Sequence, residues 1–266
     1  MNRIDKTFAD LKAEGKKALV AFLTAGDPDF DTSLEILKTA CTSGVDILEI
    51  GVPFSDPTCD GPVIQAASER ALNSDMSLTR TFELAEKLRA EVNTPIVLFS
   101  YYNPLFKYGL EKLAGKLVES GIDGILIVDL PPEEAAPLRE IIVDKEIHII
   151  RLAAPTTTPE RLKMLVDGAG GFLYLITRTG VTGTGGLDYS AVAEHAAAIK
   201  KISPLPVCLG FGISTAEDTR RMEPMADGLV VGSALVKIIA GSTNKKSLPG
   251  KIRDKIKELR SGMDTD

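Results

Sequence analysis

The chain has few of the residues that build metal sites and disulfide frameworks. Among its 266 residues are three cysteines without paired spacing and two histidines. Scattered cysteines are typical of reduced thiols in a cytosolic protein, so we expect a cytoplasmic protein without disulfides. Two histidines, with no cluster of Cys or His, argue against a histidine-based metal site, and we expect no bound metal.

Long apolar runs and blocks of basic residues are also missing. No apolar run approaches the roughly 20 residues that a membrane span needs. The first residues include no apolar h-region, so we expect no secretory signal. The net charge is −6, with acids and bases mixed along the chain, and no basic block or aromatic-basic ladder indicates nucleic-acid binding. Neither a G-x-G-x-x-G dinucleotide fingerprint nor a Walker A phosphate loop occurs.

The chain is rich in short apolar segments that are typical of β-strands. Hydrophobic residues make up 44% of it, enough for a sizeable core. Eight apolar runs recur at intervals of roughly 30 residues, the size of a βα unit, and each is followed by a helical segment. The runs are continuous rather than alternating, which is typical of strands covered on both faces. We expect strands at 18–24, 46–50, 95–101, 124–128, 148–152, 172–176, 206–209 and 227–231.

Helical patterns separate these strands. An amphipathic helix is expected over 2–15, as a layer outside the first strand. The first strand leads into a helix near 31–43, for which Asp31 or Thr32 is the expected N-cap. Further helices are expected near 62–72, 77–91, 110–119, 189–201 and 247–260.

Eight βα units that close on themselves predict a TIM barrel. We therefore expect a single-domain (β/α)₈ barrel over residues 1–266, with an extra N-terminal helix. An open, doubly wound sheet is the competing interpretation of the same pattern. No linker or composition change indicates a second domain.

Glycines follow three neighbouring strands where a phosphate would bind. Gly183 lies after the sixth strand, Gly212 after the seventh, and Gly232 with Ser233 after the eighth. Glycine lets backbone N–H groups approach an anion, and a helix N-terminus adds unpaired donors. Barrels of this class often bind phosphate with the loops after strands 7 and 8. The pattern predicts a phosphate site, although for any one loop a turn residue alone is the simpler interpretation.

One acidic side chain, Glu49, interrupts the apolar strand 46–50. Strand periodicity puts it on the face shared by Val45 and Ile47. A carboxylate there is costly unless it is paired, solvated or protonated. Burial would raise its pKa above about 4.3 and suit it to proton transfer near neutral pH. A solvated glutamate at the barrel rim is the alternative.

The loop after this strand carries two aspartates, Asp56 and Asp60. Asp60 could simply cap the helix that begins at Pro62, and Asp56 could serve only the turn. However, Glu49 and Asp60 are both expected at one mouth of the barrel, opposite the glycine loops. Two carboxylates beside a phosphate cradle indicate acid–base chemistry on a phosphorylated substrate.

Aromatic residues lie at or near several strand ends. Each alone is typical of a core, but together they describe a flat apolar pocket between the carboxylates and the phosphate site. Such a pocket fits an aromatic ring better than a sugar. The residues are Phe22, Phe99, Tyr101, Tyr174 and Phe211.

Residues 48–65, which read Leu-Glu-Ile-Gly-Val-Pro-Phe-Ser-Asp-Pro-x-x-Asp-Gly-Pro-x-Ile-Gln, resemble the signature of the tryptophan synthase alpha chain family. Family members are (β/α)₈ barrels that cleave indole-3-glycerol phosphate to indole and glyceraldehyde 3-phosphate in a retro-aldol reaction of tryptophan biosynthesis. They use no metal or organic cofactor. The resemblance extends along the chain, with matching segments at 22–28, 101–104, 129–131, 154–157, 178–183, 210–213 and 231–234.

The resemblance implies a role for each matching position. Glu49 matches the catalytic glutamate, which protonates indole C3 and helps to remove the proton of the glycerol hydroxyl. Asp60 matches the aspartate that holds the indole N–H and stabilises the positive charge on the ring. Thr182 matches a threonine that contacts Asp60 when its loop closes. The indole pocket corresponds to Phe22, Tyr101, Tyr174 and Phe211, and the phosphate site to Gly183, Gly212, Gly232 and Ser233.

The resemblance also implies a partner. The family works with a beta chain, a pyridoxal phosphate enzyme that receives indole through a tunnel, in an alpha2-beta2 heterotetramer. Pyridoxal phosphate is expected only in that partner. Pro53 and Asp56 lie in the loop expected to communicate with it.

The sequence departs from the family pattern at several places, none of them catalytic. Thr58-Cys59 stand where Leu-Ala is expected. Arg151, within the fifth strand, is a charge that points either between strand and helix or to a salt bridge at the rim. The loop after the sixth strand differs at Thr177, Thr179 and Thr184-Gly185-Gly186.

Two other functions stay open on sequence alone. A non-catalytic protein could have kept the pocket to bind phosphate ligands and regulate a beta chain. The second alternative is another phosphate-binding barrel, such as a sugar-phosphate isomerase or a thiamine-pathway synthase. No lysine at a strand end suits Schiff-base chemistry, which argues against an aldolase of that type.

Overall fold

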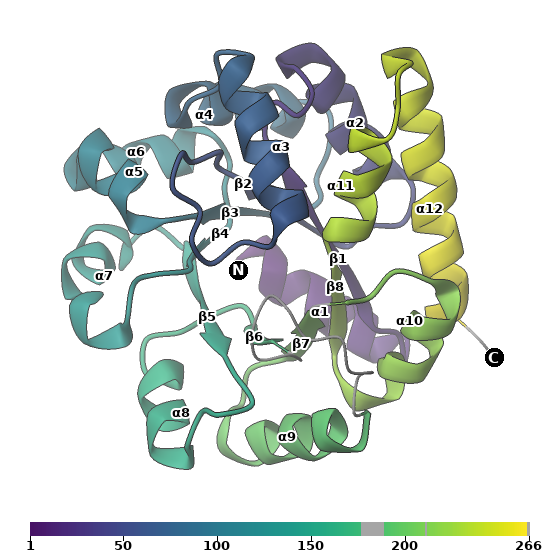
Figure 1. Ribbon diagram of the computed structural model, residues 1–266. Helices are drawn as coiled ribbons and strands as arrows, with labels where there is room; N and C mark the ends of the chain where they lie inside the picture. The colour runs from purple at the N-terminus through teal and green to yellow at the C-terminus, as the bar shows by residue number, and fades with distance from the viewer. Residues whose placement is uncertain (177–188, 211, 265–266) are drawn as a thin grey trace.

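Eight parallel strands close into a barrel in the order β1 to β8, with helices around it (Figure 1). The computed structural model describes residues 1–176, 189–210 and 212–264. The closed barrel confirms the predicted fold and excludes the open sheet. Its strands are β1 (Ala18–Thr24), β2 (Ile47–Gly51), β3 (Ile96–Ser100), β4 (Gly124–Ile127), β5 (His148–Ala153), β6 (Leu173–Ile176), β7 (Val207–Gly210) and β8 (Gly228–Val231).

The helices form the outer layer of the barrel. In the part of the chain that the structure describes, no helix is long and apolar enough to cross a membrane. The helices are α1 (Arg3–Ala13), α2 (Phe30–Thr42), α3 (Pro62–Asn73), α4 (Leu78–Arg89), α5 (Tyr102–Tyr108), α6 (Leu110–Glu119), α7 (Ala136–Ile142), α8 (Pro159–Val166), α9 (Tyr189–Ile202), α10 (Ala216–Met222), α11 (Ser233–Ala240) and α12 (Leu248–Met263).

The start of α2 differs from the expectation. Its N-cap is Asp29, whose carboxylate accepts a hydrogen bond from the Thr32 N–H at 2.9 Å. The prediction of Asp31 or Thr32 is wrong because Asp29 has the extended backbone of an N-cap, whereas both later residues are already helical. Helix α5 was not expected, since seven residues give little periodic signal.

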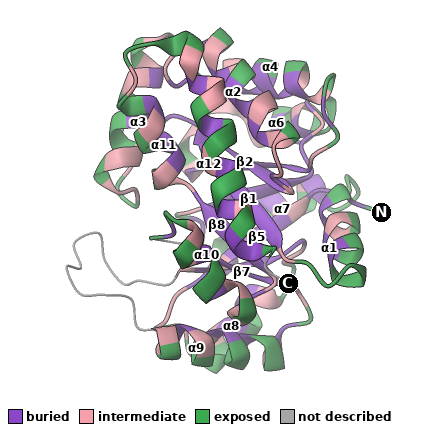
Figure 2. Ribbon diagram, turned by 90° about the vertical axis from the view of Figure 1, so that its right-hand side faces the viewer, coloured by how far each residue is buried: buried purple, intermediate pink, exposed green. Residues whose placement is uncertain are grey.

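Side chains alternate along the strands and build two apolar layers. The outward residues pack under the surrounding helices, whose outer faces are exposed (Figure 2). The inward residues form a smaller cluster inside the barrel, which Ile4, Phe8 and Leu11 of α1 join. The Phe8 ring lies 5.9 Å from that of Phe172, just before β6. The predicted N-terminal helix therefore closes the end of the barrel where the strands begin.

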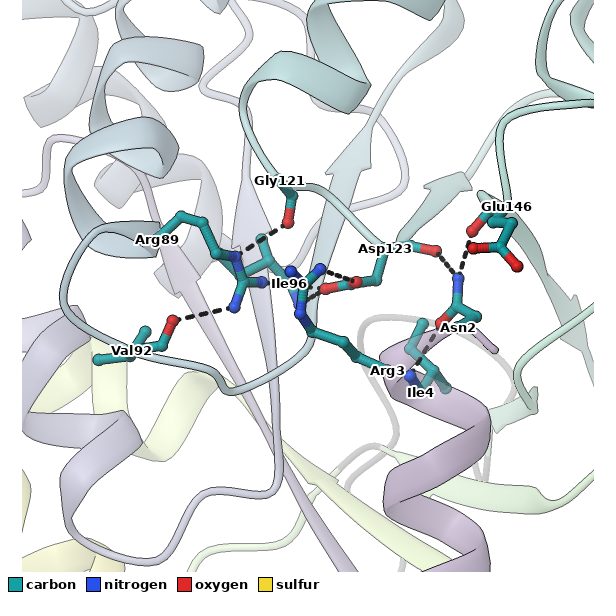
Figure 3. A network of polar contacts seen from close by, with 9 residues as sticks. All are labelled: Asn2, Arg3, Ile4, Arg89, Val92, Ile96, Gly121, Asp123 and Glu146. Carbon is teal, nitrogen blue, oxygen red and sulfur yellow. Dashed lines mark hydrogen bonds and ion pairs between the residues drawn. The ribbon is translucent and has the colours of Figure 1, made fainter.

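A polar network around Asp123 holds α1 against this end (Figure 3). The buried Asp123 carboxylate accepts hydrogen bonds from Arg3 Nη1 at 2.7 Å, Arg89 Nη2 at 3.0 Å and the Ile96 N–H at 2.8 Å. The Asn2 side-chain amide donates to the Asp123 carbonyl oxygen at 2.8 Å. One carboxylate thus joins α1, α4 and β3 at the start of β4.

Replacing Asp123 by alanine is expected to lower the free energy of unfolding by about 3 kcal/mol, because it leaves the largely buried Arg89 without its counter-ion. Urea denaturation measures the loss. Asp167→Ala is the matched control, since Asp167 makes an exposed pair with Arg139 at 3.6 Å and should cost less than about 1 kcal/mol. Equal losses in the two variants would show that the Asp123 network does not stabilise the fold.

Candidate active site

Glu49 lies inside the barrel on β2. Its side chain is 0% exposed. On this strand Leu48 and Ile50 pack in the outer layer and Ile47 in the inner cluster, so alternation points Glu49 inward with Ile47. The prediction that Val45 shares this face is wrong. Val45 packs in the outer layer because it precedes the first strand residue, and the two-residue period does not extend to it.

No charged group among the described residues pairs with the Glu49 carboxyl group to hold it ionised. Among the described residues, neither of its oxygens has a hydrogen-bond partner. Burial raises the pKa of Glu49 to about 8, because the charged form loses its hydration without compensation. The group is therefore protonated at neutral pH. A solvated glutamate at the rim is excluded.

A cavity of about 330 Å³ opens beside Glu49, at the end of the barrel where the strands finish. Its size suits a small-molecule ligand, and TIM-barrel enzymes keep their active sites at this end. Most of its wall is apolar. The lining residues are Phe22, Glu49, Cys59, Asp60, Gly61, Ile64, Phe99, Val128, Leu152, Tyr174, Ile176, Gly212, Ile213, Val230, Gly232 and Ser233.

Asp60 lines the same cavity from the loop between β2 and α3. It does not cap α3, whose N-cap is Gly61. Burial raises the pKa of the Asp60 carboxyl to about 6, while a hydrogen bond with Tyr101 acts in the opposite direction. The Tyr101 hydroxyl also accepts from the Cys59 N–H at 2.9 Å. Tyr101 therefore holds the loop that presents Asp60.

Close approach by two glycines makes room for the aromatic wall. A Cβ atom on Gly51 would lie 2.6 Å from Cζ of Phe22, and one on Gly210 would overlap the Tyr174 hydroxyl. The Phe22 ring packs edge-on against Phe99, with centroids 4.9 Å apart. Phe22 and Tyr174 line the cavity, whereas Tyr101 contacts the Asp60 loop.

Three of the residues predicted to hold phosphate line the cavity on the side of β7 and β8. Gly212 has φ +81°, a conformation that favours glycine, and Gly232 is the N-cap of α11. Ser233 begins that helix, whose first N–H groups have no acceptor within it. Three further residues that the sequence predicted for the site lie outside the described residues: Gly183 of the phosphate site, and Thr182 and Phe211 of the indole pocket. The departures from the family pattern at Thr177, Thr179 and Thr184-Gly185-Gly186 also lie outside them.

The loop expected to meet a partner borders a separate groove. Pro53 is buried, whereas Asp56 is exposed and accepts a hydrogen bond from the Ser55 hydroxyl at 2.5 Å. A shallow groove of about 690 Å³ runs between this loop and α3. On nearby α5, the Phe106 side chain is 63% exposed.

Several residues of the cavity wall were not predicted from the sequence. Val128 and Leu152 each follow an inward-facing residue by two positions, so counting along the strands would have found them. Cys59, Gly61 and Ile64 belong to the loop and first turn of α3, for which no such period exists. Among the residues that the structure describes, no three His, Cys, Asp or Glu side chains are grouped as a metal site.

The comparisons with known proteins agree with this geometry. The model of the family described as tryptophan synthase alpha chain matches residues 8–263. The tryptophan synthase alpha chain of Desulfatibacillum aliphaticivorans is 48% identical over 261 residues, which is 98% of each chain. The structure of tryptophan synthase subunit alpha from Legionella pneumophila superposes with a TM-score of 0.92 at 36% identity, over 99% of each chain. A chain of tryptophan synthase from M. tuberculosis gives a TM-score of 0.88 at 30% identity, over 99% of this chain and 100% of that one. The chain belongs to the tryptophan synthase alpha chain family.

Proposed function

We propose that this chain cleaves indole-3-glycerol phosphate to indole and glyceraldehyde 3-phosphate, with Glu49 as the proton carrier and Asp60 as the group that holds the indole ring. The main support for this assignment is the Glu49 carboxyl group, which is buried and protonated in an apolar cavity and has no hydrogen-bond partner in the described part of the chain. A regulatory protein without catalysis would not need such a group, because an uncompensated buried carboxyl reduces stability.

Each step of the cleavage has a group to perform it. Protonated Glu49 donates its proton to indole C3, which places a positive charge on the ring nitrogen. The Asp60 carboxylate stabilises that charge through the indole N–H. The Glu49 carboxylate then accepts the proton of the glycerol hydroxyl as the carbon–carbon bond breaks. The bonding electrons restore the indole ring, the aldehyde forms, and Glu49 is again protonated.

The shape of the cavity supports one orientation of this substrate. The indole ring would lie among Phe22, Tyr174 and the apolar strand ends. The phosphate would lie at Gly212, Gly232 and Ser233, where glycine backbone and the start of α11 supply N–H donors. The bond to be broken would then lie between the two, beside Glu49. Tyr101 would act by holding the Asp60 loop. We place Thr182, Gly183 and Phe211 in the same site on the resemblance alone.

The proposal predicts a bell-shaped pH dependence of kcat/KM for indole release. Asp60 must be ionised, so activity falls below the pKa of about 6. Glu49 must begin protonated, so activity falls above about 8. Each limb should approach about tenfold per pH unit.

Steady-state indole release by the purified chain, measured from about pH 5 to 10, tests both assignments. The Asp60→Asn variant should be less active than the wild type. Its kcat/KM should no longer fall at acid pH but should still fall at alkaline pH. A profile with no alkaline limb in the wild type would contradict the role of Glu49.

Alpha chains of tryptophan synthase work with a beta chain. We propose that this chain forms an alpha2-beta2 heterotetramer, in which only the beta chain carries pyridoxal phosphate. The loop of Pro53 and Asp56, the groove beside α3 and the exposed Phe106 would form the surface for that partner. Analytical ultracentrifugation of the mixed chains tests the assembly, and independent sedimentation of the two would contradict it.

A further inference from the structure

Arg151 is a buried cation on the outer face of β5. Its side chain is only 4% exposed, and its neighbours along the strand are apolar. One terminal nitrogen, Nη1, donates to the Leu130 carbonyl oxygen at 3.1 Å. The side chain therefore points between the strand and the outer layer, and it makes no salt bridge at the rim among the described residues.

The other edge of the Arg151 guanidinium group is unused. Among the described residues, Nε and Nη2 are buried and have no hydrogen-bond partner. These two nitrogens share the edge that binds a carboxylate or phosphate with two parallel hydrogen bonds. Arg70 uses the same edge in this chain, donating from Nε and Nη2 to the two oxygens of Asp27 at 2.8 Å each. Arg151 has the same pair of nitrogens, but no carboxylate of the described residues binds them.

The acidic side chains near Arg151 have other partners. The Asp129 carboxylate accepts from the Tyr102 N–H at 2.7 Å. The Glu133 carboxylate forms an ion pair with Arg161. A buried cation without a paired counter-ion is strongly destabilising. Arg139 and Arg161 nearby add to the positive charge, and Glu133, the acid that acts against them, has a smaller effect on Arg151 than either. An anion other than these acidic side chains would therefore be needed to neutralise the Arg151 guanidinium group.

A cavity beside Arg151 has room for such an anion. It measures about 340 Å³ and lies between the segments that follow β4 and β5, which are neighbours in the barrel (Figure 1). Thr157 lines it too, and its hydroxyl, which accepts from the Ala154 N–H at 2.9 Å, keeps its own proton to donate. Asp129 and Arg161 line it as well, and the rest of the wall is apolar. This cavity is separate from the one that contains Glu49, although Val128, Leu152 and Ile176 line both.

We propose that this cavity is a binding site for a small oxyanion, a carboxylate or a phosphate group, held by the free edge of Arg151. The anion would receive two parallel hydrogen bonds from Nε and Nη2 and a third from the Thr157 hydroxyl. Its charge would neutralise the buried guanidinium. The site is distinct from the proposed substrate phosphate site at Gly232 and Ser233 and does not depend on the proposed function.

Arginine side-chain NMR of the full chain tests the proposal. The Nε–H signal of Arg151 is identified by its loss in Arg151→Leu, and then sodium acetate or inorganic phosphate replaces chloride at constant ionic strength. The Arg151 signal should shift and saturate. A shift with acetate alone would show that the site binds carboxylates, and a shift with phosphate alone that it binds phosphate groups. A shift with both would show that it binds either kind of oxyanion. The shift with phosphate should persist in Ser233→Ala, which alters only the substrate phosphate site.

Thermal unfolding supplies a second readout. At anion concentrations about ten times the Kd, the midpoint of the wild type should rise by about 3 °C. Arg151→Leu should fold, since an apolar residue removes an uncompensated charge, and its midpoint should not respond. Arg151→Lys keeps the charge but not the two-donor edge and should lose most of the response.

Two results would overturn the proposal. The first is an Arg151 signal unmoved by either anion at about 50 mM, where a site with a Kd of about 5 mM would be nine-tenths occupied. The second is a signal that shifts only when a beta chain is added, which would assign the Arg151 edge to an acidic side chain of a partner protein.

Discussion

Replacing Glu49 by glutamine should reduce the rate of indole release by about 100- to 10,000-fold, the range that a positioned proton carrier contributes. Glutamine keeps the size of the side chain but cannot exchange a proton with indole C3 or with the glycerol hydroxyl. Of the described residues that line the cavity, the other carboxylate, Asp60, lies on the loop before α3 and not beside Glu49 on β2. The loss should fall on kcat, with little change in KM, since the apolar walls and the phosphate side of the cavity are unaltered.

Glu83→Gln is the matched control, because Glu83 is exposed on α4, away from the cavity. Its turnover should equal that of the wild type. Single-turnover indole release measures both variants. If Glu49→Gln retained more than about a tenth of the wild-type turnover, the proton-carrier assignment would be wrong.

The same substitution should stabilise the fold at alkaline pH. An unfolded glutamate has a pKa of about 4.3, whereas burial raises the pKa of Glu49 to about 8. Between these values the unfolded state has released a proton that the folded state keeps, so the free energy of unfolding of the wild type falls as pH rises. The fall is about 1.4 kcal/mol per pH unit and reaches about 4–5 kcal/mol above pH 8. Glutamine does not titrate and escapes this loss.

Urea denaturation of the wild type and Glu49→Gln at about pH 5 and pH 9 measures the effect. The variant should gain about 4 kcal/mol relative to the wild type between the two pH values, while Glu83→Gln should gain nothing. The pairing of activity loss with a gain in stability would identify Glu49 as a group kept for chemistry at the expense of stability. A difference independent of pH would mean that Glu49 is ionised in the folded protein.

The barrel was predictable because its signal is repeated eight times. Continuous apolar strands at a regular interval require cover on both faces, and closure of the barrel follows from their number. Glu49 was predictable for a related reason. A single acid within an apolar strand stands out against its neighbours, and its place on β2 then fixes the direction in which it points.

Features that depend on contacts distant in sequence were not predictable in the same way. Nothing near Tyr101 in the sequence indicates that its hydroxyl meets the Cys59 N–H. Arg151 was noticed as a charge in a strand, but its unused edge required the positions of Leu130 and Glu133. The Asp29 cap and the outward turn of Val45 were misjudged because both depend on where an element begins, within one or two residues.

The central claim is that Glu49 is protonated in the folded protein at neutral pH, ready to give its proton to the substrate. Carbon-13 NMR of the glutamate carboxyl groups, with the Glu49 signal identified by its loss in Glu49→Gln, measures this directly. The structure predicts a signal that stays protonated at pH 7 and titrates with a midpoint of about 8. A midpoint near the ordinary glutamate pKa of about 4.3 would contradict the account.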